Sequence, residues 1–318
     1  MTDSERRSPS LRRAVRGMAL ALSVVAIAST ALAAMRWEVV WGAAPGRVGA
    51  PSVTIALDTP PDSSKPAARL AVLGDVGTGD ANEWATAGLV TDAASRNPID
   101  ALVLLGDNVY PDGDPDRLGA TVFGPFGKIL EKGTALLPVL GNHDVENAPG
   151  QIAALDMPGR WYATEIGPTL IIGLDSNLVD DRDQLRWLES TLAGNESPWV
   201  IVTMHHPAYS AGYHGSTEDI QERWVPVFER YGVDLVLAGH DHDYQRTKPI
   251  VGVTYIVSGA AARTRPTDRA SFTAYAASVL HYLDIAIWGD RIEVTAYSAA
   301  GPFDHFTLND TIPAGPNG

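Results

Sequence analysis

Residues 233–242 read Val-Asp-Leu-Val-Leu-Ala-Gly-His-Asp-His, an apolar run that ends in a glycine and two histidines separated by one residue. The apolar run predicts a buried β-strand over 233–239. His240 and His242 alternate along the segment that follows, and with a bend after Gly239 they can bind different metal ions. The stretch therefore predicts both a strand of a buried sheet and a metal site at the end of that strand.

The same pattern, an apolar run followed by metal-binding residue types, occurs four more times upstream. The blocks are Gly74-Asp75-Val76-Gly77, Gly106-Asp107-Asn108-Val109-Tyr110, Gly141-Asn142-His143-Asp144 and Val202-Thr203-Met204-His205. Each block alone is also compatible with a turn, a loop or a helix cap. Among the residues of the five blocks are seven candidate ligands, enough for two adjacent metal ions: Asp75, Asp107, Tyr110, Asn142, His205, His240 and His242. Two such ions are what the hydrolysis of a phosphate ester requires.

Strand-like runs alternate with helical patterns from Arg69 onward, which predicts parallel βαβ units. The predicted strands are 70–74, 101–106, 136–141, 170–174, 199–204 and 233–239, and the predicted helices are 81–96, 182–193 and 219–231. Residues 279–308 are rich in strand signals and predict further antiparallel strands. Because sites assemble at the carboxyl ends of strands in α/β sheets, the five blocks are expected to meet in one pocket.

The composition limits which metal ligands and which partners are possible. The 318 residues are 45% hydrophobic, as expected of a globular protein with a sizeable core. The chain has no cysteine, so disulfides and thiolate-bound metals are excluded and the metal ligands must be oxygen and nitrogen. A formal charge of −14 argues against nonspecific binding of nucleic acid. An anionic substrate must then be attracted by bound cations.

The N-terminus predicts export. Five arginines precede an uncharged apolar stretch over 17–34, and Ala31-Leu32-Ala33 matches a signal-peptidase site. Residues 1–34 are therefore interpreted as a signal peptide or a retained membrane anchor, and the protein as secreted, periplasmic or exposed on the cell surface. Residues 35–68 are interpreted as a linker or wrapping segment, 69–310 as the catalytic domain and 311–318 as a tail.

The ordered set D-x-G, G-D-x-x-Y, G-N-H-D, V-x-x-H and G-H-x-H resembles that of calcineurin-like metallophosphoesterases. More narrowly, it is similar to the purple acid phosphatases, including their tartrate-resistant branch. Most other members of the superfamily carry histidine at the third position of the first motif, where this chain has Gly77. Purple acid phosphatases instead end the second motif with tyrosine, here Tyr110. The resemblance covers about residues 69–310.

The resemblance implies an α/β fold, a four-layer αββα sandwich of two mixed β-sheets flanked by helices, with a dinuclear metal site at the strand ends. One metal ion would be bound by Asp75, Asp107, Tyr110 and His242. The other would be bound by Asp107, Asn142, His205 and His240. The family uses ferric iron in the tyrosine site and Fe, Zn or Mn in the second. Since few residues precede the first catalytic strand, the form without an additional β-sandwich is expected.

The resemblance also implies hydrolysis of phosphate monoesters through in-line attack on phosphorus by metal-bound hydroxide. His143 would protonate the leaving alkoxide or hold the phosphoryl group, and His214 matches a second outer histidine of the tartrate-resistant branch. The expected partner is a small phosphate ester. A phosphodiesterase or nucleotide-cleaving enzyme with the same metals remains an alternative, and a noncatalytic anchored binding module is another. The oligomeric state is not predicted.

Several further residues carry weaker expectations. His206 follows a ligand on a strand end and is expected to point to the opposite face as a structural residue. Tyr244 and Arg246 extend the fifth motif and are expected to brace it. The three arginines after Ser258 are expected in a solvated loop, with contact to a substrate as the alternative. Two isolated histidines are expected to have no role in the site; these five residues are Arg263, Arg265, Arg269, His281 and His305.

Overall fold

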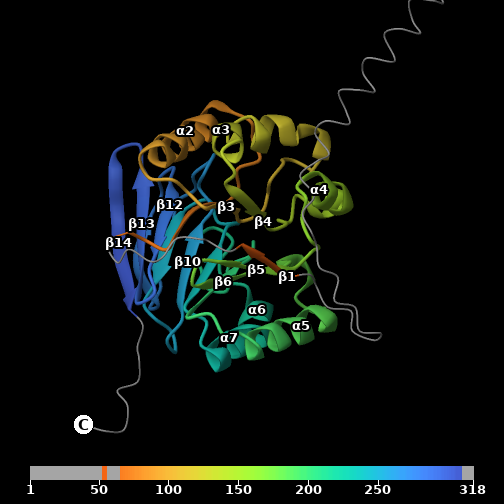
Figure 1. Cartoon of the computed structure of the whole chain (residues 1–318), viewed down its shortest axis with the longest axis vertical. Coiled ribbons are helices and arrows are strands. Elements are labelled where there is room, and N and C mark those ends of the chain that lie inside the picture. Colours follow the sequence, from red (N-terminus) through yellow and green to blue (C-terminus); the bar gives the residue numbers. More distant parts are fainter. Residues whose placement is uncertain (1–51, 56–64, 310–318) are drawn as a thin grey trace, which may run out of the picture. The chain divides into compact units, whose positions relative to one another are not determined.

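The computed structural model describes residues 52–55 and 65–309 (Figure 1). The expected signal peptide or anchor, most of the expected linker and the tail lie outside the described residues. Within the part of the chain that the structure describes, no helix is both long and apolar enough to cross a membrane.

Two mixed β-sheets form the centre of the fold. The eight-stranded sheet has the order β1 (Ser52–Ile55), β5 (Tyr162–Ile166), β6 (Thr169–Gly173), β7 (Trp199–Thr203), β8 (Leu235–Ala238), β10 (Thr254–Ser258), β9 (Tyr244–Thr247) and β11 (Thr273–Ala277). The six-stranded sheet has the order β14 (Gly301–Asn309), β13 (Arg291–Ser298), β12 (Tyr282–Ile287), β2 (Ala68–Leu73), β3 (Ala101–Leu104) and β4 (Ala135–Pro138). In each sheet the central strands that carry the site are parallel.

Helices cover the outer faces of both sheets (Figure 1). On the side of the six-stranded sheet are α2 (Ala81–Arg96), α3 (Gly127–Leu130) and α4 (Ala148–Ala154). On the side of the eight-stranded sheet are α5 (Arg182–Ala193), α6 (Glu218–Arg223) and α7 (Val225–Tyr231). Single turns occur at Pro115–Arg117, Gly119–Phe123, Val145–Asn147 and Ser176–Leu178. The predicted α/β fold with two sheets between helices is therefore confirmed.

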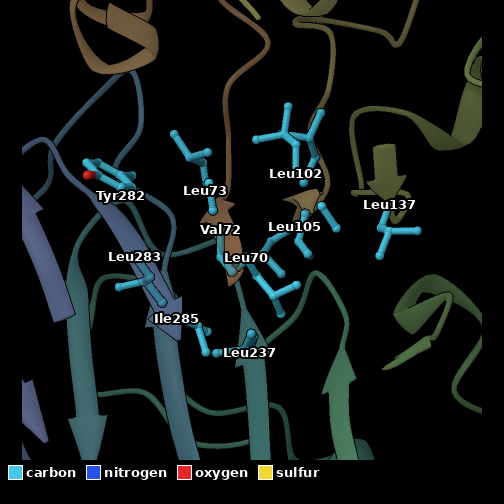
Figure 2. Packing of buried hydrophobic residues seen from close by; sticks show 14 of the residues in the cluster. Leu70, Val72, Leu73, Leu102, Leu105, Leu137, Leu237, Tyr282, Leu283 and Ile285 are labelled. Carbon is cyan, nitrogen blue, oxygen red and sulfur yellow. The ribbon is translucent and has the colours of Figure 1, made fainter. Parts of the chain in front are cut away.

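Apolar packing between these layers explains the sequence pattern of the strands. Leu70, Leu102 and Leu237 belong to one cluster of buried side chains that joins the two sheets and the inner face of α2 (Figure 2). A second cluster joins the outer face of the eight-stranded sheet to α5, α6 and α7. Strand β2 is covered on both faces and is nearly continuously apolar, whereas β13 alternates between buried and partly exposed residues.

The helix predictions hold where capping signals are present. Asp80 accepts hydrogen bonds from two backbone N–H groups at the start of α2, and Asp181 does the same for α5, so both helices begin and end as predicted. The single helix predicted over 219–231 is wrong. It breaks at Trp224 because Pro226, in the first turn of α7, lacks the N–H group that a continuous helix needs. Strand β1, within the expected linker, pairs in parallel with β5.

One polar contact ties the strand after the fifth motif to the other sheet. Asp304 on β14 accepts hydrogen bonds from the Tyr244 hydroxyl at 2.6 Å and from Arg246 Nε at 2.7 Å. Tyr244 and Arg246 therefore brace β9 against the second sheet and do not contact the histidines of the motif through these bonds. Burial raises the pKa of Asp304, but hydrogen bonds from Arg246 and Tyr244 outweigh burial and leave this pKa below its usual value.

Replacing Asp304 with Ala should lower the free energy of unfolding by about 2–4 kcal/mol, because Arg246 and the Tyr244 hydroxyl lose their acceptor. Since the folded pKa is lowered, this stabilisation is present above the unfolded pKa of about 3.9 and is lost as the pH falls through the folded value. Urea unfolding at several pH values measures both effects. Asp290→Ala removes an exposed ion pair and should leave the stability close to that of the wild type; an equal loss in both variants would contradict the bracing role.

Candidate functional site

The five sequence blocks meet at one edge of the fold. Asp75, Asp107 and Asn142 follow neighbouring strands β2, β3 and β4, and His205 and His240 follow neighbouring strands β7 and β8. The two sheets face each other, so the carboxyl ends of these parallel strands open onto a common cavity of about 470 Å³. Its lining includes five of the seven predicted ligands and both predicted catalytic histidines: Asp107, Tyr110, Asn142, His240, His242, His143 and His214.

One group of donor atoms gathers around Asp75. The Tyr110 hydroxyl lies 3.0 Å from Asp75 Oδ1 and 3.2 Å from His242 Nε2. His242 Nε2 is itself 3.4 Å from Asp75 Oδ1. Burial raises the pKa of Tyr110, and the Asp75 and Asp107 carboxylates raise it further, so without a cation the side chain is a neutral phenol that donates to Asp75.

A second group gathers around His205. Its Nε2 atom lies 3.0 Å from Asn142 Oδ1, 3.2 Å from His240 Nδ1 and 3.5 Å from Asp107 Oδ1. The opposite nitrogen, His205 Nδ1, is 2.8 Å from the Leu105 carbonyl oxygen. Because a carbonyl only accepts, Nδ1 carries the proton and the Nε2 lone pair faces the other three donor atoms.

The backbone at this edge adopts an unusual conformation. Three predicted ligands have left-handed backbones, with φ of 61° at Asp75, 52° at Asp107 and 70° at His240. Only two other described non-glycine residues have positive φ, Asp156 and Val251. Non-glycine residues in this region are strained, and such strain concentrates at functional sites. It turns each chain sharply as it leaves its strand and directs the side chain toward the neighbouring blocks.

Glycine is required where the blocks approach one another. A Cβ atom on Gly141 would lie 2.1 Å from Asp107 Oδ1, and one on Gly239 would lie 2.6 Å from Asp75 Oδ2. Neither distance is possible for a real side chain. The glycines of the third and fifth blocks therefore let these carboxylates lie against a neighbouring backbone.

The surroundings of His240 and His206 favour neutral imidazoles, whereas those of His205 favour positive charge. Burial, together with the neighbouring His205, lowers the pKa of His240 to about 2. Burial lowers the pKa of His206 to about 3, again with a contribution from His205. For His205, burial lowers the pKa, but Asp107 and Asp75 outweigh burial and raise it, so positive charge is favoured where the carboxylates converge.

The two groups of donor atoms fit two metal ions. Metal–ligand bonds of about 2.0–2.2 Å place neighbouring ligand atoms about 3 Å apart, as the distances around Asp75 and His205 do. The donors are carboxylate, phenol and amide oxygens with imidazole nitrogens, a set suited to iron, zinc or manganese. Asp75, Asp107 and His205 also place their ligand atoms within 4.8 Å of one another, so Asp107 lies close to both groups.

His143 faces the cavity beside Tyr110, with 4.7 Å between the ring centroids. Its backbone N–H donates to Asp107 Oδ1 at 3.0 Å, and its Nδ1 lies 2.5 Å from the Pro111 carbonyl oxygen. Since the carbonyl only accepts, Nδ1 carries a proton and Nε2 is the atom available for exchange with a substrate. Asp144 forms its bonds with other residues, so His143 is not held by that carboxylate.

His214 is brought to the same cavity by a loop that is fixed at several points. Its ring lies 4.2 Å from the His240 ring, and its backbone N–H donates to Asp241 Oδ1 at 2.8 Å. Its Nε2 accepts from Arg265 at 3.1 Å. Burial lowers the pKa of His214, and the neighbouring Arg265 charge also lowers it, although Asp241 opposes both.

Two expectations about neighbouring residues are wrong. His206 does not point to the opposite face: its ring lies 4.6 Å from that of His240, and its Nδ1 is 2.9 Å from Ser176 Oγ. Strand β7 ends at Thr203, so the alternation of side chains that the expectation assumed has already stopped. Arg265 is half-buried and contacts His214, whereas the sequence predicted a solvated loop.

The remaining isolated residues behave as expected. The His281 ring is buried and bonds to Ser258 Oγ at 2.9 Å, and burial lowers its pKa to about 4. His305 is exposed and contacts Thr295. Arg269 is exposed on the loop that also carries Arg263 and Arg265.

Sequence reasoning missed two buried aspartates that hold the ligand loops. Asp144 accepts from the backbone N–H groups of Asn108 and Gly141 at 3.1 and 2.9 Å, and from Gln151 Nε2 at 2.6 Å. Burial and the neighbouring Asp107 carboxylate raise its pKa to about 6, against the hydrogen bonds from Gly141 and Asn108 that lower it. Asp241 fixes the His214 loop. Each stands inside a ligand block, which is the one signal that the sequence offered.

Comparison with known sequences places these motifs in a family. A sequence profile of the calcineurin-like phosphoesterases matches residues 68–244, more than half of the chain. Purple acid phosphatase 21 of Arabidopsis thaliana is 29% identical over 230 residues, which cover 64% of this chain and 50% of the relative. Human tartrate-resistant acid phosphatase type 5 is 28% identical over 251 residues, 65% of this chain and 77% of the relative. The chain thus spans half of the plant protein's length and about three quarters of the human one.

Solved structures share the fold. A purple acid phosphatase, PPD1, from yellow lupin seeds superimposes with a TM-score of 0.63 at 17% identity, covering 77% of this chain and 55% of that one. GAP50, described as the anchor in the inner membrane complex of Plasmodium, superimposes with a TM-score of 0.68 at 18% identity, covering 76% and 89%. At these identities the likeness establishes the architecture alone.

Replacing Asp144 with Asn should weaken metal binding about tenfold to a hundredfold, because an amide offers one acceptor oxygen and turns its NH2 toward N–H donors. Titration of metal into the metal-free variant at neutral pH measures the change. Glu146→Gln, two residues away and exposed, is the matched control and should bind like the wild type. Unchanged affinity in Asp144→Asn would show that these loops hold their shape without it.

Proposed function

The chain belongs to the calcineurin-like phosphoesterase family, and we propose that it is a dinuclear metal-dependent phosphoesterase that hydrolyses phosphate monoesters. The observation that supports this most directly is the convergence of seven oxygen and nitrogen donors, from five separated segments, into two adjacent groups. The fold alone is insufficient, because it is also that of GAP50, described as an anchor. The donor set is what distinguishes a hydrolase from a noncatalytic binding module.

The first ion would be held by Asp75, Tyr110 and His242, with Asp107 shared, and the second by Asn142, His205 and His240, again with Asp107. The ions, when bound, polarise the phosphoryl oxygens and lower the pKa of water so that it can attack phosphorus. His205 keeps its ligand nitrogen unprotonated through the bond from Nδ1 to Leu105. This arrangement would keep the binding nitrogen available without a rearrangement of the ring.

His143 and His214 lie on the open side of the donor groups and would act on the substrate directly. With its Nδ1 directed to the Pro111 carbonyl, His143 can hold a second proton only at Nε2. That proton would be transferred to the oxygen of the leaving alcohol. His214 accepts from Arg265, and this contact would hold its ring beside His240 as the substrate binds.

Hydrolysis of p-nitrophenyl phosphate and of bis(p-nitrophenyl) phosphate tests the proposal. The metal-free protein should be inactive on both, and addition of metal should restore activity mainly on the monoester. Preference for the bis-ester would instead support a phosphodiesterase. Failure to hydrolyse either compound after loading of two ions per chain would favour a binding module.

His143→Ala should lower kcat by roughly 10²–10⁴ for esters of poor leaving groups, the usual effect of losing a general acid. Esters of p-nitrophenol should be affected less because this leaving group needs no proton. The kcat of wild type and variant on a phenyl and a p-nitrophenyl ester gives the comparison. Equal losses on both substrates would mean that His143 binds the phosphoryl group instead.

We also propose ferric iron at the tyrosine site, because a phenolate oxygen is a donor that suits it. The iron-loaded protein should then absorb visible light through charge transfer from Tyr110 to iron, giving a violet or pink colour. Tyr110→Phe should lose this band while retaining Asp75 and His242 as ligands. A colourless wild-type protein that contains stoichiometric ferric iron would refute the tyrosinate assignment and leave the phosphoesterase proposal intact.

Residues 1–34 remain the proposed export signal or membrane anchor, on the basis of their arginines and uncharged apolar stretch. The catalytic residues all follow Arg69, and the described domain packs around its own core. The proposed site therefore does not depend on whether this N-terminal segment is cleaved or retained.

A further inference from the structure

Arginines are distributed unevenly between the surface and the cavity. Seven of the thirteen arginines in residues 65–309 form ion pairs with carboxylates. Of the six described arginines that form no ion pair, three line the cavity at the donor groups: Arg117, Arg263 and Arg265. In a chain with a net charge of −14, three uncompensated guanidinium groups at one site call for an anionic partner.

The cavity next to the site is lined, within the described residues, by acidic side chains and not by arginines. It measures about 870 Å³, shares Asn142 with the first cavity and is lined by Asp180, Asp181 and Asp219, with no arginine among its lining residues in the described chain. The first cavity, in contrast, has a single lining carboxylate, Asp107. A substrate with a second negative charge would therefore extend toward the arginines and away from the aspartates.

The arginines are held in place by contacts that leave most of their donors free. Arg265 is fixed through its backbone N–H to the His242 carbonyl at 2.8 Å, and its guanidinium lies 4.5 Å from the Tyr213 ring centre. Arg263 lies 5.7 Å from the Tyr110 ring centre, and Arg117 donates to the Tyr110 carbonyl. Each guanidinium has five N–H donors, of which these contacts use at most one.

We propose that Arg117, Arg263 and Arg265 form an anion subsite that binds a second phosphoryl group on the leaving group of the substrate. The inference rests on the proposed phosphoesterase function. In that function the bound metal ions and the two histidines would contact the reacting phosphoryl group, so a simple monoester would leave the three guanidinium charges unmatched. Guanidinium groups pair with phosphate oxygens through parallel hydrogen bonds, a geometry that selects phosphate over a diffuse negative charge.

The reaction at such a substrate is ordinary hydrolysis of one ester bond. Water would attack the phosphorus, the bond from phosphorus to the leaving oxygen would break, and that oxygen would take a proton. The products are inorganic phosphate and an alcohol that still carries the second phosphoryl group. The arginines hold this second group throughout, so their effect appears mainly in KM and in kcat/KM for bisphosphates.

The experiment compares kcat/KM for pairs of substrates that differ by one phosphoryl group, on the metal-loaded full chain. Glucose 1,6-bisphosphate against glucose 6-phosphate forms one pair, and adenosine 3′,5′-bisphosphate against AMP forms a second, which separates sugar from nucleotide substrates. The wild type should prefer the bisphosphate by roughly tenfold to a hundredfold in at least one pair, as expected of a charge-assisted hydrogen bond.

Arg263→Gln and Arg117→Gln should each reduce this preference severalfold, through a higher KM for the bisphosphate. Arg263→Lys, which keeps the charge, should retain part of it. Arg269→Gln is the matched control: the residue lies on the same loop outside the cavity lining, and the variant should keep the wild-type ratio. A wild type without preference in either pair, or a preference unchanged in both glutamine variants, would overturn the subsite. A wild type inactive on all phosphate esters would instead refute the proposed function.

Discussion

This protein is organised around one electrostatic problem: two buried carboxylates lie close to other oxygen and nitrogen atoms whose lone pairs point toward them. Asp75 and Asp107 are almost completely buried, and Nε2 of His205 faces acceptor oxygens while the proton lies on Nδ1, on the opposite side of the ring. Buried charge of one sign is costly unless it is paired or coordinates a metal. Cations between these atoms would remove the repulsion, because one positive centre would satisfy several donors at once. The arrangement of the surrounding loops is best understood as the means of holding the donors at that spacing.

The apolar core holds the loops of the site in backbone conformations that these loops would not adopt by themselves. Left-handed backbones at Asp75, Asp107 and His240 cost of order 1–3 kcal/mol each. Each follows a buried strand whose position is fixed by packing between the sheets and under the helices (Figure 2). Asp144 and Asp241 then fix the loops by accepting backbone N–H groups. The core therefore fixes the strands, the strands and their hydrogen bonds fix the loops, and the loops place the donor atoms.

Short contiguous signals made much of this predictable. The strand preceding His240 and the capped helices after Asp80 and Asp181 are encoded within ten to twenty residues, and their placement follows from the sequence alone. The family resemblance added the two groups of ligands. The proximity that the structure shows among these residues agrees with that assignment, although their roles as metal ligands remain a proposal.

Long-range and interrupted features could not be predicted in the same way. His206 was misplaced because the end of β7, and with it the end of side-chain alternation, depends on tertiary packing. The contact between Arg265 and His214 joins residues 51 positions apart in the sequence, and the ion pair between Asp304 and Arg246 joins residues 58 positions apart. The break at Trp224 had a local signal in Pro226, but apolar periodicity on both sides obscured it. Charge placement within the cavity likewise appears only when separate loops are brought together.

The central claim is that the two groups of donors hold two ions at once. A crystal structure of the metal-loaded protein, with anomalous diffraction measured at the absorption edges of the bound metals, tests it most directly. Two anomalous peaks should appear, one contacted by Asp75, Tyr110 and His242 and the other by Asn142, His205 and His240, with Asp107 between them. A single peak under saturating metal, or peaks that do not contact these side chains, would contradict the assignment.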